Sequence, residues 1–183
     1  MKVLGISGSL RRDSHNRKVL QTAIELLPDG VKLEIFDGLK EVPPYDADDD
    51  RGPAPAAVAR LRAAIASADA LLIATPEYNS SIPGQLKNAL DWASRPIATN
   101  VLRNKPVAVV GASTSAFGAV WAQAELRKVL GATGARVLDR ELAISRAHES
   151  FDPQGRLAGE ECQVLQGIVE ELVAEAAPLP AAA

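Results

Sequence analysis

The chain has 183 residues, of which 47% are hydrophobic and 23% are charged, and its formal net charge is −3. This is an ordinary globular composition, and the small net charge argues against the broad basic face that nucleic-acid binding requires. A single cysteine, Cys162, excludes an internal disulfide framework. No apolar run is long enough for a signal peptide or a membrane span, so we expect a cytoplasmic protein without nucleic-acid or membrane partners.

The expected elements alternate between strands and helices along the chain. Short apolar runs predict buried strands, and apolar residues repeated at helical spacing predict helices. Because the central runs are apolar on both faces, they indicate a parallel sheet covered by helices on each side. In chain order, we expect strand 3–7, helix 14–27, strand 31–36, helix 56–68, strand 70–75, helix 83–94, strand 106–111, helix 118–130 ended by Gly131, strand 135–138 and helix 159–175.

Five strands in this arrangement fit a doubly wound α/β fold in three layers, with strand order 2-1-3-4-5. We expect residues 1–177 to form a single domain and residues 178–183 to form a flexible C-terminal tail. Ligands of such sheets bind at the carboxyl ends of the strands, beside the reversal in strand order. The loops expected there are 8–16, 75–82 and 111–117.

The first of these loops lies within the sequence GISGSLRRDSHN, residues 5–16. Its three serines offer hydroxyl groups, and Arg11 and Arg12 offer positive charge. Ser14 is placed to cap the following helix, whose free amides and positive dipole end suit a phosphate group. The other interpretation is a serine-rich turn with a capped helix and two solvated arginines.

Other ligand-binding motifs fit the sequence less well. The first loop has no Walker A lysine, and residues 5, 7 and 10 are Gly, Ser and Leu where a Rossmann fingerprint needs three glycines. Asp37, after the second strand, resembles the ribose-binding acid of a dinucleotide site, but it more simply begins an acidic loop. The segment DADDDRG, residues 46–52, lacks the glycine and the glutamate of a calcium loop, so we expect no metal site.

The second loop lies within the sequence TPEYNSSIPGQLKNALDW, residues 75–92. Pro76, Asn79 and Pro83 indicate a rigid, unusual backbone between a buried strand and a helix, which suits the hydrogen-bonding edge of a flat heterocycle. Tyr78 adds an aromatic surface. The third loop, GASTSAFG at residues 111–118, has small residues that would let a flat ring approach the backbone. Alternatively, these are a proline-rich turn and a tightly packed strand–helix connection.

Three segments together resemble the NADPH-dependent FMN reductase family. They are GSLRRDSHN, PEYNSSIPGQLKNALDW, and NKPVAVVGAST with the following FGAVWAQAELRKVL. The likeness extends from Lys2 to about Asp139 and weakly over residues 151–157. It implies a flavodoxin-like fold and a bound FMN whose phosphate contacts Ser9, Arg11, Ser14 and Asn16, with a backbone contact from His15. It implies in the same way that the isoalloxazine is lined by Pro76, Glu77, Tyr78, Asn79 and Ser80 on one side and by Ser113 and Thr114 on the other.

The sequence departs from the family pattern at two positions. Ser80 stands where many members have glycine after the PEYN motif, and Ser115 stands where glycine is frequent in the third loop. Either serine would narrow the pocket or add a hydrogen bond.

The resemblance implies an oxidoreductase that passes hydride from NADPH or NADH through FMN to a small acceptor, such as a quinone, an azo compound, free flavin or a metal oxyanion. The flavin supplies the redox chemistry, so no catalytic side chain is expected. The alternatives are a flavodoxin-type electron carrier, a flavin-free NAD-binding protein and an interaction protein on the same fold. The resemblance also implies a homodimer or a homotetramer, and Leu86, Leu90 and Trp92 belong either to its contact surface or to the core.

Overall fold

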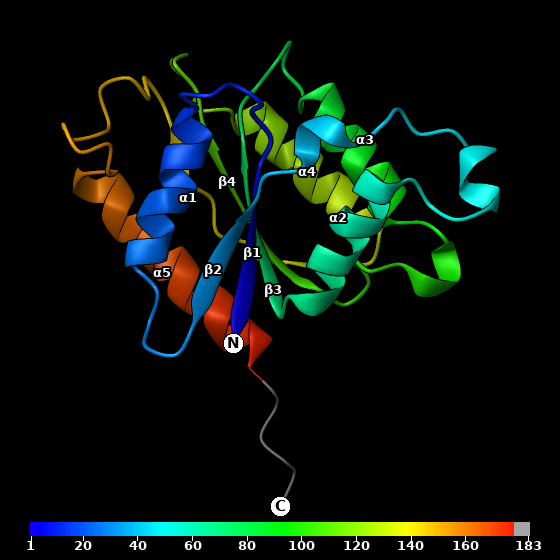
Figure 1. The fold of residues 1–183 in the computed structure, drawn as a ribbon. Coiled ribbons are helices and arrows are strands. Elements are labelled where there is room, and N and C mark those ends of the chain that lie inside the picture. Colours follow the sequence, from blue (N-terminus) through cyan, green and yellow to red (C-terminus); the bar gives the residue numbers. More distant parts are fainter. Residues whose placement is uncertain (178–183) are drawn as a thin grey trace, which may run out of the picture.

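The computed structural model describes residues 1–177, which are built around a parallel sheet (Figure 1). The strands pair in the order β2-β1-β3-β4-β5, and β6 also pairs with β4, so the predicted order is confirmed. All of these pairs are parallel. The strands are β1 (Lys2–Ser7), β2 (Lys32–Phe36), β3 (Ala70–Thr75), β4 (Pro106–Ala112), β5 (Arg136–Val137) and β6 (Ala143–Ile144).

Helices cover both faces of this sheet, and the sheet separates two apolar cores (Figure 1). On one face lie α1 (His15–Glu25) and α5 (Gly159–Ala176); on the other lie α2 (Ala56–Ser67), α3 (Gly84–Ala93) and α4 (Val120–Ala132). Short 3-10 turns are η1 (Leu39–Glu41), η2 (Asp49–Arg51) and η3 (Ile97–Thr99). Every residue of β3 and β4 is buried, which explains why these strands have no polar face. The predicted tail, 178–183, lies outside the described residues.

Helix α4 differs from the prediction at both ends. It begins at Val120 and continues through Gly131 to Ala132, so the prediction that Gly131 ends it was wrong. The residue that ends the helix is Gly134, which has a φ of 82° just beyond the cap at Thr133. Only glycine adopts this left-handed conformation readily, and it closes the last helical turn here.

The edge strand that the sequence predicts at 135–138 is divided into two short strands. Arg136 and Val137 pair with the beginning of β4, and the chain returns to pair Ala143 and Ile144 with its end. Between them, the guanidinium of Arg127 donates hydrogen bonds to the carbonyls of Val109, Leu138 and Arg140. Between β5 and β6, the side chain of Arg127 on α4 therefore bonds the carbonyls that a continuous edge strand would otherwise pair. A local sequence pattern does not reveal this contact.

The apolar residues of α3 belong to the core. Leu86 and Trp92 are 0% exposed and Leu90 is 2% exposed, which excludes them from a contact surface. The indole Nε1 of Trp92 donates to the carbonyl of Pro43 at 2.9 Å, so its polar atom is satisfied inside the protein. Within residues 1–177, no helix combines the length and apolar character that crossing a membrane requires.

Candidate functional site

The loops after β1, β3 and β4 meet at the carboxyl edge of the sheet and enclose a cavity of about 310 Å³, which we call the central cavity. Every predicted site residue except Asn79 and Ser80 lines it, so the structure brings together residues that lie far apart in the sequence. The lining residues are Ser9, Arg11, Ser14, His15, Asn16, Pro76, Glu77, Tyr78, Ala112, Ser113 and Thr114.

The loop after β1 is held tightly against β3. The N–H of Gly8 donates to the carbonyl of Ala74 at 2.8 Å. A Cβ at Gly8 would lie 2.9 Å from a methyl group of Leu86, so the close approach requires glycine. Beyond it, the N–H of Arg11 donates to Oγ of Ser9 at 3.4 Å. The loop therefore places Ser9 and Arg11 beside the N-terminal end of α1, where free backbone N–H groups favour the binding of an anion.

Two of the predicted phosphate ligands make hydrogen bonds within the protein. Oγ of Ser14 accepts from the N–H of Arg17 at 3.3 Å and caps α1, as the sequence predicts. Asn16 donates from Nδ2 to the carbonyl of Ala112 at 2.9 Å and accepts the N–H of Ala112 at Oδ1 at 3.0 Å. The amide of Asn16 therefore joins the start of α1 to the end of β4. Its predicted contact with the phosphate stays a prediction.

His15 lies in the first turn of α1, and its ring stacks on Phe151 with the centroids 5.6 Å apart. Burial lowers the pKa of His15 below its ordinary value, and the nearby charges of Arg11 and Lys18 lower it further. Nδ1 of His15 is buried and makes no hydrogen bond within residues 1–177. With its proton on Nδ1, this ring would donate a hydrogen bond to the phosphate of FMN, beside Arg11 and the N-terminal end of α1.

The loop after β3 turns back on itself at its tip. The N–H and the carbonyl of Tyr78 both bond to Ser81, at 2.9 and 3.1 Å. Asn79 and Ser80, between them, have φ values of 53° and 60°, the combination of a type I′ turn. This conformation explains why glycine is frequent where this chain has Ser80. The turn lifts Asn79 and Ser80 away from the central cavity, while Tyr78 remains on its wall with 52% of its surface exposed.

Glu77 caps a helix that begins in another loop. Its Oε2 accepts the backbone N–H groups of Trp121 and Ala122 at 3.0 and 3.1 Å. The residue before α4 is Ala119, whose side chain has no acceptor for these groups. The absence of a capping residue before α4 was the only sign of this role in the sequence. Glu77 therefore holds the second loop against the start of α4.

The third loop is fastened by the segment that follows β6. The N–H of Ser113 donates to the carbonyl of Ile144, and the N–H of Ala147 donates to the carbonyl of Ser113, both at 3.0 Å. The N–H of Arg146 donates to the carbonyl of Ser115 at 2.9 Å. Gly118 packs so closely that a Cβ there would lie 2.5 Å from the carbonyl carbon of Ala143. Sequence reasoning missed this support because it did not predict β6.

Comparison with known proteins places this arrangement among flavin-dependent reductases. The model of the family described as NADPH-dependent FMN reductase matches residues 1–149. A Pseudomonas aeruginosa protein named as an NAD(P)H-dependent FMN reductase is 47% identical over 166 residues, which cover 90% of this chain and 89% of that protein. A 2-hydroxy-1,4-benzoquinone reductase of a Burkholderia species is 38% identical, with 88% and 87% of the two chains covered.

A solved structure agrees with these relatives. The flavoenzyme NAD(P)H:(acceptor) oxidoreductase FerB from Paracoccus denitrificans superposes with a TM-score of 0.86. Its sequence is 36% identical, and the match covers 96% of each chain. These findings confirm the sequence-based expectation of a flavodoxin-like oxidoreductase that depends on FMN and NAD(P)H. The chain belongs to the NADPH-dependent FMN reductase family.

Proposed function

We propose that this protein uses FMN to pass electrons from a reduced nicotinamide nucleotide to a quinone. Membership of the family implies FMN as the cofactor and NADPH or NADH as the electron donor. The quinone, as the electron acceptor, is what we propose. Relatives named as quinone reductases include one from Pseudomonas putida that is 36% identical over 91% of this chain. The observation that supports the proposal most directly is the central cavity. At one end it has groups that can donate hydrogen bonds to a phosphate, and at the other end it is lined by the loops after β3 and β4.

The two ends of the central cavity have different tasks in this proposal. At the first end, Ser9, Arg11 and the first-turn N–H groups of α1 would hold the phosphate of FMN. At the second, residues 76–78 and 113–114 would border the isoalloxazine, whereas Asn79 and Ser80 lie outside this cavity. When bound, FMN accepts hydride from reduced nicotinamide and reduces the acceptor by two electrons. Glu77 is engaged by two backbone N–H groups, so its task is to hold the ring-binding loop in place.

The test begins with the protein reconstituted with FMN and mixed with NADPH or NADH without oxygen. We expect rapid bleaching of the flavin and then turnover with a benzoquinone. An azo dye, free flavin and chromate are the other acceptors to compare, because the family resemblance implies them as well. A flavin that the nucleotide does not reduce would instead indicate an electron carrier, and a protein that takes up no FMN would overturn the proposal.

Arg11→Ala tests the phosphate end of the central cavity. Removing one charged hydrogen bond should weaken FMN binding by about 1.5–3 kcal/mol. Equilibrium dialysis measures this change, and Lys128→Gln, which removes an exposed cation on α4, is the matched control. Unchanged FMN affinity in Arg11→Ala would remove Arg11 from the proposed site.

Assembly and location are further parts of the proposal. A homodimer or homotetramer would cover the exposed aromatic side chains of Tyr78, Phe117 and Trp121, which are 52%, 58% and 47% exposed. Sedimentation velocity of the wild type and of Trp121→Ser measures the oligomer and its dependence on this surface. We propose a cytoplasmic location, which fractionation of cells that produce the protein would test.

A further inference from the structure

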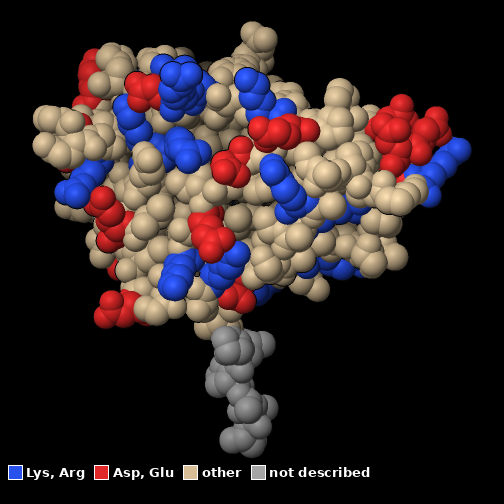
Figure 2. All heavy atoms as spheres, in the orientation of Figure 1, with Lys and Arg blue, Asp and Glu red and all other residues tan. Residues whose placement is uncertain are grey.

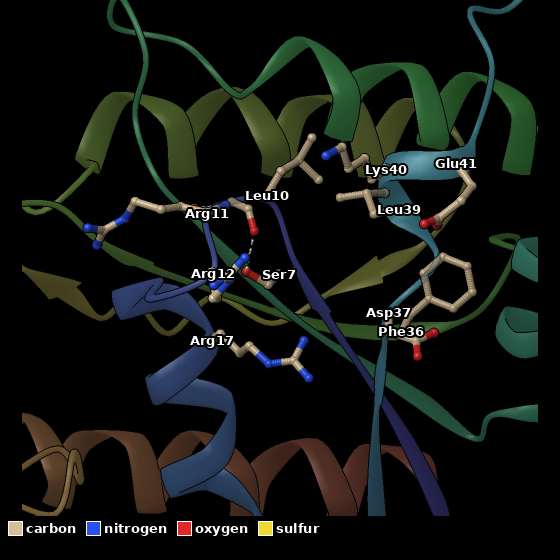
Figure 3. Close-up of a pocket in the computed structure, with 11 residues that line it drawn as sticks. Ser7, Leu10, Arg11, Arg12, Arg17, Phe36, Asp37, Leu39, Lys40 and Glu41 are labelled. Carbon is tan, nitrogen blue, oxygen red and sulfur yellow. Dashed lines mark hydrogen bonds between the residues drawn. The ribbon is translucent and has the colours of Figure 1, made fainter.

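A second cavity, of about 420 Å³, lies on the other side of the loop after β1 (Figure 3). It is bounded by that loop and by the segment that leaves β2, so we call it the β1–β2 cavity. It shares only Ser9 and Arg11 with the central cavity. Its size is within the range of pockets that hold small ligands. The proposed FMN site uses none of the other residues that line it.

The β1–β2 cavity has an excess of positive charge. Arg12, Arg17 and Lys40 line it, and none of them forms an ion pair with any carboxylate in the described part of the chain. Figure 3 shows Arg17 and Lys40 directed into the cavity, while Arg11 is directed away from it. On the upper part of the face in Figure 2, lysine and arginine side chains lie among aspartate and glutamate side chains.

Two carboxylates lie at the rim of the same cavity. Glu41 is paired with Arg60 at 3.8 Å, so a further cation partly offsets its charge. Asp37 is exposed and lies at the end of β2. In dinucleotide-binding folds, an acid after the second strand accepts a hydrogen bond from the ribose 2′-hydroxyl of NAD, whereas an arginine accommodates the 2′-phosphate of NADP. Asp37 would therefore repel a 2′-phosphate. The three cations of this cavity outnumber that one exposed carboxylate, so the net attraction is for an anion.

The remaining wall is apolar. Leu10, Phe36 and Leu39 line the β1–β2 cavity, and Leu39 is only 3% exposed. The half-buried ring of Phe36 offers a surface on which a purine can pack. A ligand that fits this cavity therefore has a flat apolar part and a strongly anionic group.

We propose that the β1–β2 cavity binds the adenosine 2′-phosphate end of NADPH. This inference rests on the proposed function, since it places the nucleotide that reduces the flavin. NADPH and NADH differ only in the 2′-phosphate, which is a dianion and makes strong charge-assisted hydrogen bonds with arginine and lysine. FMN and NADPH then contact opposite sides of one loop.

The first test measures binding to the FMN-loaded protein by calorimetry, with 2′,5′-ADP and 5′-AMP as probes. We expect 2′,5′-ADP to bind at least about tenfold more tightly than 5′-AMP. Arg17→Gln and Lys40→Gln should each weaken 2′,5′-ADP binding by about tenfold or more. Lys128→Gln, on the distant α4, should leave this binding unchanged. Equal affinity for the two probes in the wild type would overturn the inference.

The second test compares the two nucleotides as electron donors. In Arg17→Gln, the ratio of kcat/KM for NADPH to that for NADH should fall by about tenfold. An unchanged ratio would overturn the inference. Loss of 2′,5′-ADP binding when FMN saturates the protein would also overturn it, because FMN would then occupy the β1–β2 cavity. A protein that binds 2′,5′-ADP selectively but oxidises neither nucleotide would support this cavity while overturning the proposed function.

Discussion

Replacing Asn16 with alanine tests whether this residue holds the central cavity together. Its amide makes two hydrogen bonds to the backbone of Ala112, at 2.9 and 3.0 Å, and both residues are 2% exposed. In Asn16→Ala, the N–H and the carbonyl of Ala112 lose these partners in a buried position. Each buried group left unsatisfied costs about 1–3 kcal/mol, so the loss of both partners should lower the free energy of unfolding by about 2–6 kcal/mol.

Urea unfolding of the protein without FMN measures this loss when it is followed by tryptophan fluorescence, to which buried Trp92 and exposed Trp121 both contribute. Gln21→Ala, at an exposed position on α1, is the control and should change the stability by less than about 0.5 kcal/mol. Asn16→Asp keeps the shape but replaces the Nδ2 donor with an acceptor, so we expect it to be destabilised as well. If Asn16→Ala unfolds like the wild type and only FMN binding weakens, the residue is a cofactor ligand and our reasoning is wrong.

Three further predictions concern the loops around the central cavity. Glu77→Gln keeps an acceptor for the N-terminus of α4 but removes its charge, so it should lose about 0.3–1 kcal/mol of stability, less than Glu77→Ala in parallel thermal unfolding. Ser80→Gly removes the backbone strain of a serine held at a φ of 60°, so the free energy of unfolding in urea should rise by up to about 1 kcal/mol. A decrease would show that the serine side chain stabilises the turn. Because the folded-state pKa of His15 lies below its ordinary 6.5, the unfolded chain binds the proton more readily, and His15 makes the protein less stable as the pH falls through that value. The urea midpoint of His15→Gln should therefore vary less between about pH 7 and 5 than that of the wild type, and an equal variation would count against this role.

The sheet could be predicted because its central strands are unambiguous in the sequence. Residues 70–75 are predicted and observed as β3 with the same limits, since a short apolar run that alternates with helices along the chain is typical of a buried parallel strand. The serine cap of α1 was also predicted, because Ser14 and the helical spacing after it are local signals. The three loops then follow from the strand order, which places their ends at one edge of the sheet.

The supports of the central cavity could not be predicted, because they join residues that lie far apart in the chain. Asn16 reaches Ala112, Glu77 reaches the start of α4, and Ser113 is fastened by Ile144. A side chain suited to bind phosphate is equally suited to bind backbone, and only the fold shows which partner is present. On the sequence alone, the side chains of Asn16, Glu77 and Ser113 are therefore assigned to contacts with FMN.

The divided edge of the sheet has a consequence for how this protein can change. Arg127 reaches the carbonyls of Val109, Leu138 and Arg140 with one planar group, and a lysine at this position would present a single point of charge. The connection between β5 and β6 can thus vary in length only while its carbonyls still meet the guanidinium. In a comparison across many such reductases, substitutions at this arginine should accompany insertions or deletions in residues 138–142, as a linked evolutionary event.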